Sequence, residues 1–473
     1  MVSAKAVCTQ VLRKITPKGA ERKLILSLAK RMQRRVSKAA SHFKLKAKVR
    51  IDGSVAKDTW LSGEADIDIF IQVPTKLSQE KFQTACLEVA KRALEGYRWI
   101  ERFAEHPYLE TWVDGTRVDI VPCYAVKRGE WLRATDRTPF HTGYVKKHLT
   151  EQLKGEVRLL KKFMKGVGVY GAEIKIGGFS GYLCELLTLY YKSFLNVLAA
   201  AMKWGRPQII DLENYYLNRL DEVKKLFEAP LIIIDPIDKG RNVAAAVAEN
   251  RLYEFIAASK AFLEKPSLNF FYPVETKPIL ADALIEKLKI RGTDLVFIKF
   301  GEVKAVPDIL WGQLHRSLRA LANLLKQNEF NIIRATAWSD ETANNTLIFE
   351  LESRTLPPIK KHVGPPIDSK EAKAFLAKHV GAPHTFSGPW IENGRWMVEI
   401  KRKYTDAIEL LKDKLRDNGV NVGVTKLLSE EIKKSHKVLA NEAILDFYTS
   451  NIGFAKFLTE FLIGRPHWLE QPS

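Results

Sequence analysis

Cysteine is scarce in this sequence, with four residues among 473. No two of them are spaced as a C-x-x-C pair, so the sequence argues against both a zinc site and a disulfide framework. The same scarcity is typical of proteins from a reducing compartment. We therefore expect a cytoplasmic protein.

Long hydrophobic stretches without charge are also absent. The most apolar long segment, Phe179 to Trp204, contains Glu185 and Lys192, so it predicts a buried helix rather than a membrane span. The N-terminal residues contain no apolar core of signal-peptide length. We expect neither a signal peptide nor a membrane partner.

Acidic residues are almost missing from the first 50 positions. This segment holds 15 Lys or Arg residues against the single acid Glu21, which places +14 of the formal net charge of +20 there. A basic excess of this size favours an anionic partner, of which nucleic acid is the commonest for a soluble protein. The alternative is a solvated basic helix face.

The length predicts several domains, because one hydrophobic core rarely serves a chain of 473 residues. Residues 1–145 show a mixed pattern of helices and strands, residues 146–270 are mainly helical, and residues 271–473 return to a mixed pattern. In the first part, a helix over 21–43 is predicted from apolar residues at four-residue spacing, namely Leu24, Leu28, Met32 and Val36. In the third part, a strand, a long helix and two strands resemble half of a ferredoxin-like or RNA-recognition sheet.

Two aspartates one residue apart stand out in the segment GSVAKDTWLSGEADIDIF, residues 53–70. Residues i and i+2 of a strand point to the same face, so Asp66 and Asp68 are expected to project together while isoleucines bury the opposite face. A third acid, Asp119, lies on the second strand of a predicted hairpin whose turn is Asp114-Gly115. Pro122 is expected to end that strand.

Three carboxylates on neighbouring strands are what two-metal phosphoryl transfer requires. Mg²⁺ prefers hard oxygen ligands, and a cation would relieve the repulsion between the acids. The sequence therefore predicts Mg²⁺ at Asp66, Asp68 and Asp119 if their strands are neighbours. The alternative is that Asp66 and Asp68 lie on an exposed strand face and that Asp119 is simply solvated.

The residues before the paired aspartates favour a phosphate ligand. Gly53 would let the backbone approach a phosphate closely, and Ser54 would add a hydroxyl donor. Lys57 is a natural partner for a triphosphate oxygen. No GxxxxGK[ST] loop is present, and GVGVYG at 166–171 follows a predicted helix, so it is interpreted as a helix-ending loop rather than a dinucleotide fingerprint.

These motifs together resemble the nucleotidyltransferase superfamily headed by DNA polymerase β, and within it the family of archaeal, class I CCA-adding enzymes. The resemblance is dense over roughly residues 20–270 and looser beyond. The motifs that carry it are GSVAKDTWLSGEADIDIF, EHPY, RVDIVPCY, DRTPFHTGYV, EVRLLKKF, VYGAEIKIGGFSGYLCELL and DPIDKGRNVAA.

The resemblance implies an α+β multidomain fold. Its parts would be a polymerase β-like nucleotidyltransferase palm at 1–145, a helical central domain at 146–270, and a ferredoxin- or RRM-like C-terminal body with an α/β tail at 271–473. It also implies template-independent addition of C, C and A to tRNA from CTP and ATP. The C-terminal domains would grip the tRNA acceptor and TΨC arms. The sequence leaves open whether the chain acts as a monomer or a homodimer.

The family's functional residues carry over by motif. Asp66, Asp68 and Asp119 would hold Mg²⁺, and Gly53, Ser54 and Lys57 would meet the triphosphate, with lysine at a position where arginine is as often expected. The residues that would complete the nucleotide site are His141, Lys161 and Tyr170, with Arg241 at the base edge.

Each of the last assignments has a structural alternative. Lys161 would otherwise lie on a solvated helix face, and Tyr170 would be a core aromatic. Arg241, next to a helix predicted to start near Asn242, would be paired with Asp235 or Asp238. For the whole chain, the alternatives are a poly(A) polymerase or other template-free terminal transferase, a non-catalytic RNA-binding protein, and a kinase-like or ligase-like phosphoryl transferase.

Overall fold

The computed structural model describes residues 3–103, 107–417 and 419–469. It divides into two compact units, Met1–Glu275 with Arg465–Ser473, and Thr276–Gly464. Glu105 and His106 of the EHPY motif lie outside the described residues. The bounds of the three predicted domains, 1–145, 146–270 and 271–473, stay a prediction. No helix in the described ranges is long and apolar enough to cross a membrane.

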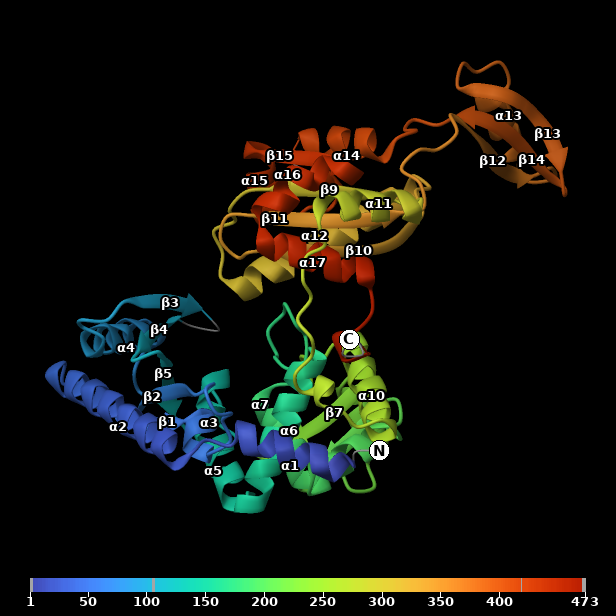
Figure 1. The fold of residues 1–473 in the computed structure, drawn as a ribbon. Helices are drawn as coiled ribbons and strands as arrows, with labels where there is room; N and C mark the ends of the chain where they lie inside the picture. Colours follow the sequence, from blue (N-terminus) through green and yellow to red (C-terminus); the bar gives the residue numbers. More distant parts are fainter. Residues whose placement is uncertain (1–2, 104–106, 418, 470–473) are drawn as a thin grey trace. The chain divides into compact units, whose positions relative to one another are not determined.

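The first unit combines a five-stranded sheet, a group of helices and a small three-stranded sheet (Figure 1). Its elements in chain order are α1 (Ala4–Ile15), α2 (Gly19–His42), β1 (Lys48–Asp52), α3 (Gly53–Lys57), β2 (Asp66–Pro74), α4 (Gln79–Ala93), β3 (Trp99–Phe103), β4 (Pro107–Val113), β5 (Thr116–Ala125), α5 (Thr138–His148), α6 (Glu151–Val167), α7 (Gly181–Tyr191), α8 (Phe194–Ala201), β6 (Gln208–Asp211), α9 (Leu220–Leu226), β7 (Leu231–Asp235), β8 (Asp238–Asn242) and α10 (Glu249–Glu264).

The five-stranded sheet has the order β1-β2-β5-β4-β3. Strands β2 and β5 are parallel, and the other neighbours are antiparallel. Helices α2 and α4 pack on the face that buries the isoleucines of β2. The α2 helix confirms the predicted helix, but Leu24 is 64% exposed and Ile25 is buried in its place, because the apolar stripe follows a 3.6-residue rather than a four-residue period.

The hairpin between β4 and β5 confirms the predicted turn. Asp114 and Gly115 both have positive φ, 51° and 75°, as a type I′ turn requires. The prediction that Pro122 ends the second strand is wrong, since β5 continues to Ala125. Pairing with β4 reaches only Ile120, so Pro122 lies where β5 pairs with β2, and this leaves room for a residue without an N–H group.

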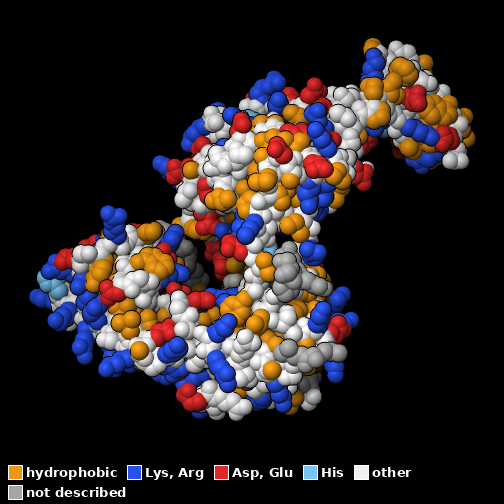
Figure 2. Space-filling view, viewed as in Figure 1, with side chains coloured by type: hydrophobic (Ala, Val, Ile, Leu, Met, Phe, Trp, Pro, Cys, Tyr) orange, Lys and Arg blue, Asp and Glu red, His pale blue; other side chains and the backbone are white. Residues whose placement is uncertain are grey.

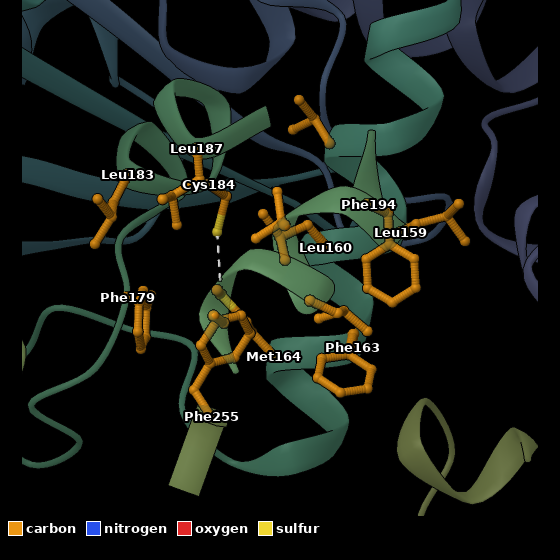
Figure 3. Packing of buried hydrophobic residues seen from close by; sticks show 14 of the residues in the cluster. Leu159, Leu160, Phe163, Met164, Phe179, Leu183, Cys184, Leu187, Phe194 and Phe255 are labelled. Atoms are coloured by element: carbon orange, nitrogen blue, oxygen red, sulfur yellow. Dashed lines mark hydrogen bonds between the residues drawn. The ribbon is translucent and has the colours of Figure 1, made fainter. Parts of the chain in front are cut away.

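The helical part of this unit is organised around Phe163 of α6. Its ring centroid lies 5.4 to 6.3 Å from those of Phe194, Phe255, Phe262, Phe270 and Phe271. Figure 3 shows part of this core, including the Cys184 thiol that donates to the Met164 sulfur at 3.4 Å. Helix α1 also packs here, through Val7 and Val11. The central helices therefore form one rigid apolar block.

One predicted helix boundary is wrong. Strand β8 occupies Asp238–Asn242 and pairs with β7, and the next helix, α10, begins only at Glu249. Asn242 explains the difference, because its side chain accepts from the Ile233 and Ala244 N–H groups and donates to the Leu231 carbonyl. These bonds satisfy backbone groups of the sheet rather than of a helix start.

The second unit contains a four-stranded sheet of order β10-β11-β9-β15 and a three-stranded sheet of order β12-β14-β13. The strand, helix, strand, strand order predicted from the sequence is confirmed by β9, α12, β10 and β11. Its elements are α11 (Ala281–Arg291), β9 (Asp294–Phe300), α12 (Pro307–Gln327), β10 (Ile332–Ser339), β11 (Asn345–Leu351), β12 (Ile359–Pro366), α13 (Ala372–His379), β13 (Thr385–Glu392), β14 (Arg395–Lys401), α14 (Ala407–Arg416), α15 (Lys426–Lys434), β15 (His436–Ala440), α16 (Leu445–Ser450) and α17 (Ile452–Ile463).

Two glycines of α6 should respond in opposite ways to alanine. A Cβ at Gly166 would lie 2.2 Å from the Phe270 carbonyl oxygen, so Gly166→Ala should destabilise the protein by ~1–3 kcal/mol. A Cβ at Gly155 would lie 3.4 Å from a Leu12 methyl, so Gly155→Ala should be neutral or stabilise by up to ~1 kcal/mol. Urea unfolding measures both; equal stabilities of the two variants would contradict the packing described here.

Candidate functional site

The three aspartates lie on neighbouring parallel strands. Asp68 of β2 is the register partner of Asp119 of β5, and Asp66 is opposite Arg117. Ile67 and Ile69 are fully buried on the other face of β2. The expectation that the two strands are neighbours is therefore confirmed, and the backbone brings the carboxylates to one face of the sheet.

Burial and mutual repulsion disfavour the charged forms of these acids. Desolvation, then Asp119 and Asp66, raises the pKa of Asp68 to about 7. Desolvation also raises the pKa of Asp119 to about 6, against the opposing charge of Arg117. The pKa of Asp66 is raised by the same cause, although this residue is exposed to solvent. The fully ionised form of the three aspartates is therefore unfavourable.

Arg117 and Glu110 are site neighbours that the sequence analysis did not assign. The Arg117 guanidinium donates from Nη2 to Asp119 at 2.9 Å and lies 3.0 Å from Glu110 through Nε. Glu110 also accepts from Arg102 at 2.9 Å. The hairpin register pairs Glu110 with Asp119, and this was the signal available in the sequence.

The donor set fits a hard divalent cation. Carboxylate oxygens are the ligands such ions prefer, and a cation would offset the repulsion that raises the pKa values of Asp68 and Asp119. As the described side chains stand, no three His, Cys, Asp or Glu groups converge on one metal position. Asp119 faces Arg117, whose Nε donates to Asp119 Oδ1 at 3.3 Å.

Gly53 allows the backbone to pass directly against Asp68. Gly53 has φ of 68°, and a Cβ there would lie 1.7 Å from Asp68 Oδ2. Both the conformation and the space require glycine. Ser54 follows at the start of α3 and is half-buried. The Gly-Ser turn thus lies next to the paired aspartates, and the role of Gly53 and Ser54 toward a phosphate stays a prediction.

Lys57, expected at the triphosphate, and Lys161, expected elsewhere in the nucleotide site, share a buried carboxylate. Glu185 of α7 has no solvent exposure, and its Oε2 accepts from Lys57 Nζ at 2.6 Å. Its Oε1 accepts from the Thr59 hydroxyl at 2.7 Å and lies 3.6 Å from Lys161 Nζ. Lys161 also donates to the Thr59 carbonyl oxygen at 3.2 Å. Lys161 is 3% exposed, so the alternative of a solvated helix face is wrong.

The electrostatics of this cluster favour a salt bridge. Burial lowers the pKa of Lys161, with a further contribution from Lys57 and against the attraction of Glu185. Burial by itself would raise the pKa of Glu185, but Lys57 and Lys161 outweigh it and the pKa is lowered. Glu185 and Thr59 were missed as site residues. The signal for Glu185 was its single negative charge in an otherwise apolar helix.

Tyr170 lies beside the lysine cluster. A Cβ at Gly181 would be 3.0 Å from the Tyr170 hydroxyl and 3.5 Å from Lys161 Nζ, so both groups meet at the start of α7. Tyr170 is half-buried and packs against the hydrophobic core of the helical part, in agreement with the alternative considered for it. The loop that carries it follows Gly168, which ends α6 with φ of 87°, so the interpretation of GVGVYG as a helix-ending loop is confirmed.

A second cluster gathers around Asp235, the last residue of β7. Its Oδ2 lies 2.7 Å from Arg241 Nη1 and 2.9 Å from His141 Nε2. Its Oδ1 accepts from the Tyr182 hydroxyl at 3.1 Å. Arg241 stands on β8 rather than at a helix start, and its pairing with Asp235 agrees with the alternative considered for it. His141, on α5, lies at the same carboxylate.

Tyr182 connects the two clusters. Its ring centroid is 4.0 Å from that of His141 and 5.8 Å from Lys57 Nζ. The structure therefore brings together the predicted residues of the phosphate end and of the base end, although they come from five different helices, loops and strands. Lys57 also acts on Asp68, whose pKa it lowers against the larger effect of burial.

Three family models match the chain in succession. They describe a nucleotidyltransferase domain at residues 33–148, the second domain of tRNA nucleotidyltransferase at 155–272, and the C-terminal domain of the CCA-adding enzyme at 291–441.

Curated relatives match over nearly their whole length. The CCA-adding enzyme of Methanosarcina barkeri is 37% identical over 438 residues, which cover 92% of this chain and 93% of the relative. That of Pyrobaculum islandicum is 37% identical over 436 residues, covering 92% and 99%. A solved structure, the Cid1 poly(U) polymerase, matches with a TM-score of 0.45 and 14% identity over 54% of this chain and 92% of its own, which is too distant to support an argument.

Asp68→Asn should flatten the pH dependence of stability in the metal-free protein. The Asp68 pKa of about 7 lies above the ordinary value of 3.8, so between these values the folded chain holds a proton that the unfolded chain has released. The free energy of unfolding therefore falls as the pH rises through this window, by less than ~1.4 kcal/mol per pH unit because Asp68 is only half-buried.

The measurement is urea unfolding of wild type and Asp68→Asn in EDTA, at several pH values between about 4 and 7. Comparison with the variant removes the contribution of titrating groups that do not interact with Asp68, whereas Asp66 and Asp119 interact with it and their titration changes in the variant. Parallel profiles for the two proteins would show that Asp68 is not protonated in the folded state.

Proposed function

The chain belongs to the family of CCA-adding enzymes, and we propose that it adds C, C and A in turn to the 3′ end of tRNA, from CTP and ATP and without a template. The observation that carries the proposal is the likeness to CCA-adding enzymes over 92% of this chain. The register of Asp68 with Asp119, next to the Gly53-Ser54 turn, supports it at the level of chemistry.

Enzymes of this nucleotidyltransferase class generally use divalent metal ions, and we propose Mg²⁺ here. Asp66, Asp68 and Asp119 would hold it. When bound, the metal lowers the pKa of the attacking hydroxyl and offsets negative charge on the triphosphate. The carboxylates themselves orient the reacting groups on one face of the sheet, and the isoleucines behind them keep that face rigid.

The proposed reaction joins the 3′-hydroxyl oxygen of tRNA to the α-phosphorus of the nucleotide. The bond from the α-phosphorus to the bridging oxygen breaks, pyrophosphate leaves, and the hydroxyl proton is released. Lys57 and Lys161 supply two positive charges against the one negative charge of Glu185, which leaves a net cation for the leaving pyrophosphate. Ser54 would add a hydroxyl donor to the triphosphate.

We assign the remaining predicted residues to the nucleoside. Arg241 carries a fork of N–H donors suited to the O2 and N3 acceptors of cytosine. Tyr170 lies near Lys161 at the start of α7, and His141 bonds to Asp235, so they would contact the nucleoside from these two clusters. These roles follow from the family resemblance and from the clustering of the side chains.

The tRNA partner is matched by positive charge on α2. Lys23, Lys30, Arg34 and Lys38 are exposed along this helix. Figure 2 shows Lys and Arg side chains over the face on which α2 lies. The C-terminal unit, which matches the C-terminal domain of CCA-adding enzymes, would grip the acceptor and TΨC arms. Phosphate contacts by such residues release counterions, so binding should weaken with salt.

Incubation with tRNA lacking its 3′ end, CTP and ATP should yield a product three nucleotides longer that ends in A. Chelation of divalent metal should stop the addition, and restored Mg²⁺ should recover it. A sequencing gel resolves the product lengths. An open-ended tail would instead identify a poly(A) polymerase or another template-free terminal transferase, and addition in excess EDTA would contradict the metal assignment.

Lys161→Ala should raise KM for CTP and ATP by a similar factor, on the order of 10-fold, because the lysine is proposed to meet a phosphate that both share. Lys162→Ala is the matched control, since Lys162 is the next residue of α6 and pairs with Glu64 at 3.8 Å. Steady-state kinetics with each nucleotide measure the effect. A loss confined to one nucleotide would contradict a triphosphate role.

A further inference from the structure

The Asp235 carboxylate is completely buried and both of its oxygens are occupied. Oδ2 accepts from Arg241 and His141, and Oδ1 accepts from the Tyr182 hydroxyl and from the Ile237 N–H at 3.1 Å. A buried carboxylate with four donors around it has a single orientation, because rotation would break several bonds together. This single orientation in turn restrains the side chains that bond to the carboxylate.

Arg241 is held at one end only. Nη1 bonds to Asp235, while Nη2 and Nε make no hydrogen bond to any residue in the described ranges. The side chain is 37% exposed, so these two donors are accessible to a ligand. A guanidinium bonded through Nη1 is restrained at that nitrogen, and its remaining N–H groups lie in the same plane as the bonded one.

A fixed pair of donors distinguishes the four bases by simple chemistry. Cytosine offers acceptors at O2 and N3, and adenine offers an acceptor at N1. Uracil carries a hydrogen at N3 and guanine carries one at N1, so each would place a donor against a donor. A polar group that is buried without a partner is costly, and sites built on hydrogen bonds reject such analogues strongly.

The anchored arginine is also connected to the phosphate end of the site. The Tyr182 ring contacts the His141 ring at 4.0 Å, and Lys57 Nζ lies 5.8 Å from the centre of the same ring. The Asp235 cluster therefore lies next to the lysine that is proposed to meet the triphosphate. A mobile arginine could adjust to any base, whereas an anchored one cannot.

We propose that Asp235 is the positioning residue for base selection: by anchoring Arg241 and His141 at one oxygen, it makes the site accept C and A and reject U and G. This inference rests on the proposed function, since it concerns the nucleotide that the same site takes. Asp235 itself does not touch the nucleotide. Its effect passes through the orientation of Arg241.

The test compares kcat/KM for CTP and UTP on tRNA lacking its 3′ end, and for ATP and GTP on tRNA ending in CC. Asp235→Asn keeps the shape of the side chain but removes the charge that anchors Arg241. The preference for CTP over UTP should fall about 10-fold or more, with a smaller change in kcat/KM for CTP itself. The ATP preference over GTP should fall in the same direction.

Asp238→Asn is the matched control. Asp238 lies three residues further along the chain and pairs with Arg137 at 2.8 Å, so its replacement removes a charge of the same kind without touching Arg241. Its base preferences should remain those of the wild type. Tyr182→Phe, which removes one bond to Asp235 and no charge, should give a partial loss of preference.

The outcomes distinguish a failure of the proposed function from a failure of the inference on Asp235. If the wild type adds neither C nor A to tRNA, the proposed function fails. If the wild type adds both and folded Asp235→Asn keeps wild-type preferences, or loses activity equally with all four nucleotides, the inference on Asp235 is wrong while the function stands. If thermal unfolding shows that Asp235→Asn does not fold, Tyr182→Phe decides, and unchanged preferences there overturn the inference.

Discussion

The repulsion between carboxylates on β2 and β5 is the constraint on which the first unit depends. Parallel pairing places Asp68 opposite Asp119 on a strand pair whose other face is fully apolar. A folded chain tolerates this arrangement by keeping protons on the acids, as the raised pKa values of Asp68 and Asp119 indicate, or by placing cations nearby, and Arg117 and Lys57 serve in part. Gly53 adds a steric condition, because the backbone passes the Asp68 carboxylate with no space for a side chain.

Buried charge is also what ties the sheet to the helices. Glu185 bonds to Lys57 at the end of α3 and lies near Lys161 of α6, so one carboxylate connects the strand-following turn with the helical block. Buried pairs of this kind contribute little net stability, because desolvation offsets the attraction. Here they act by positioning. They hold the Lys57 and Lys161 ammonium groups in one place, although side-chain entropy favours many conformations of each lysine.

Local patterns predicted the elements that depend on neighbours in the chain. The Asp114-Gly115 turn, the strand with Asp66 and Asp68, and the βαββ order of the second unit were all found as expected. The failures have different causes. The continuation of β5 past Pro122 depends on pairing with β2, a strand from a distant part of the chain. The strand at Arg241 in place of a helix start belongs to a local hairpin, in which β8 pairs with the preceding strand β7.

The sequence by itself determined which chemical groups are present, namely the carboxylates with their Gly-Ser turn and a basic N-terminal segment. It also carried a family resemblance that the relatives confirm. These follow from residue types and short spacings, which a linear pattern records. Only the tertiary structure decided the partners of these groups. Lys57 meets Glu185 across 128 positions, and His141 meets Asp235 across 94, since such contacts arise from how helices and strands pack. The sequence left open whether Arg241 pairs with Asp235 or Asp238, and the structure pairs it with Asp235 while His141 reaches the same carboxylate from α5.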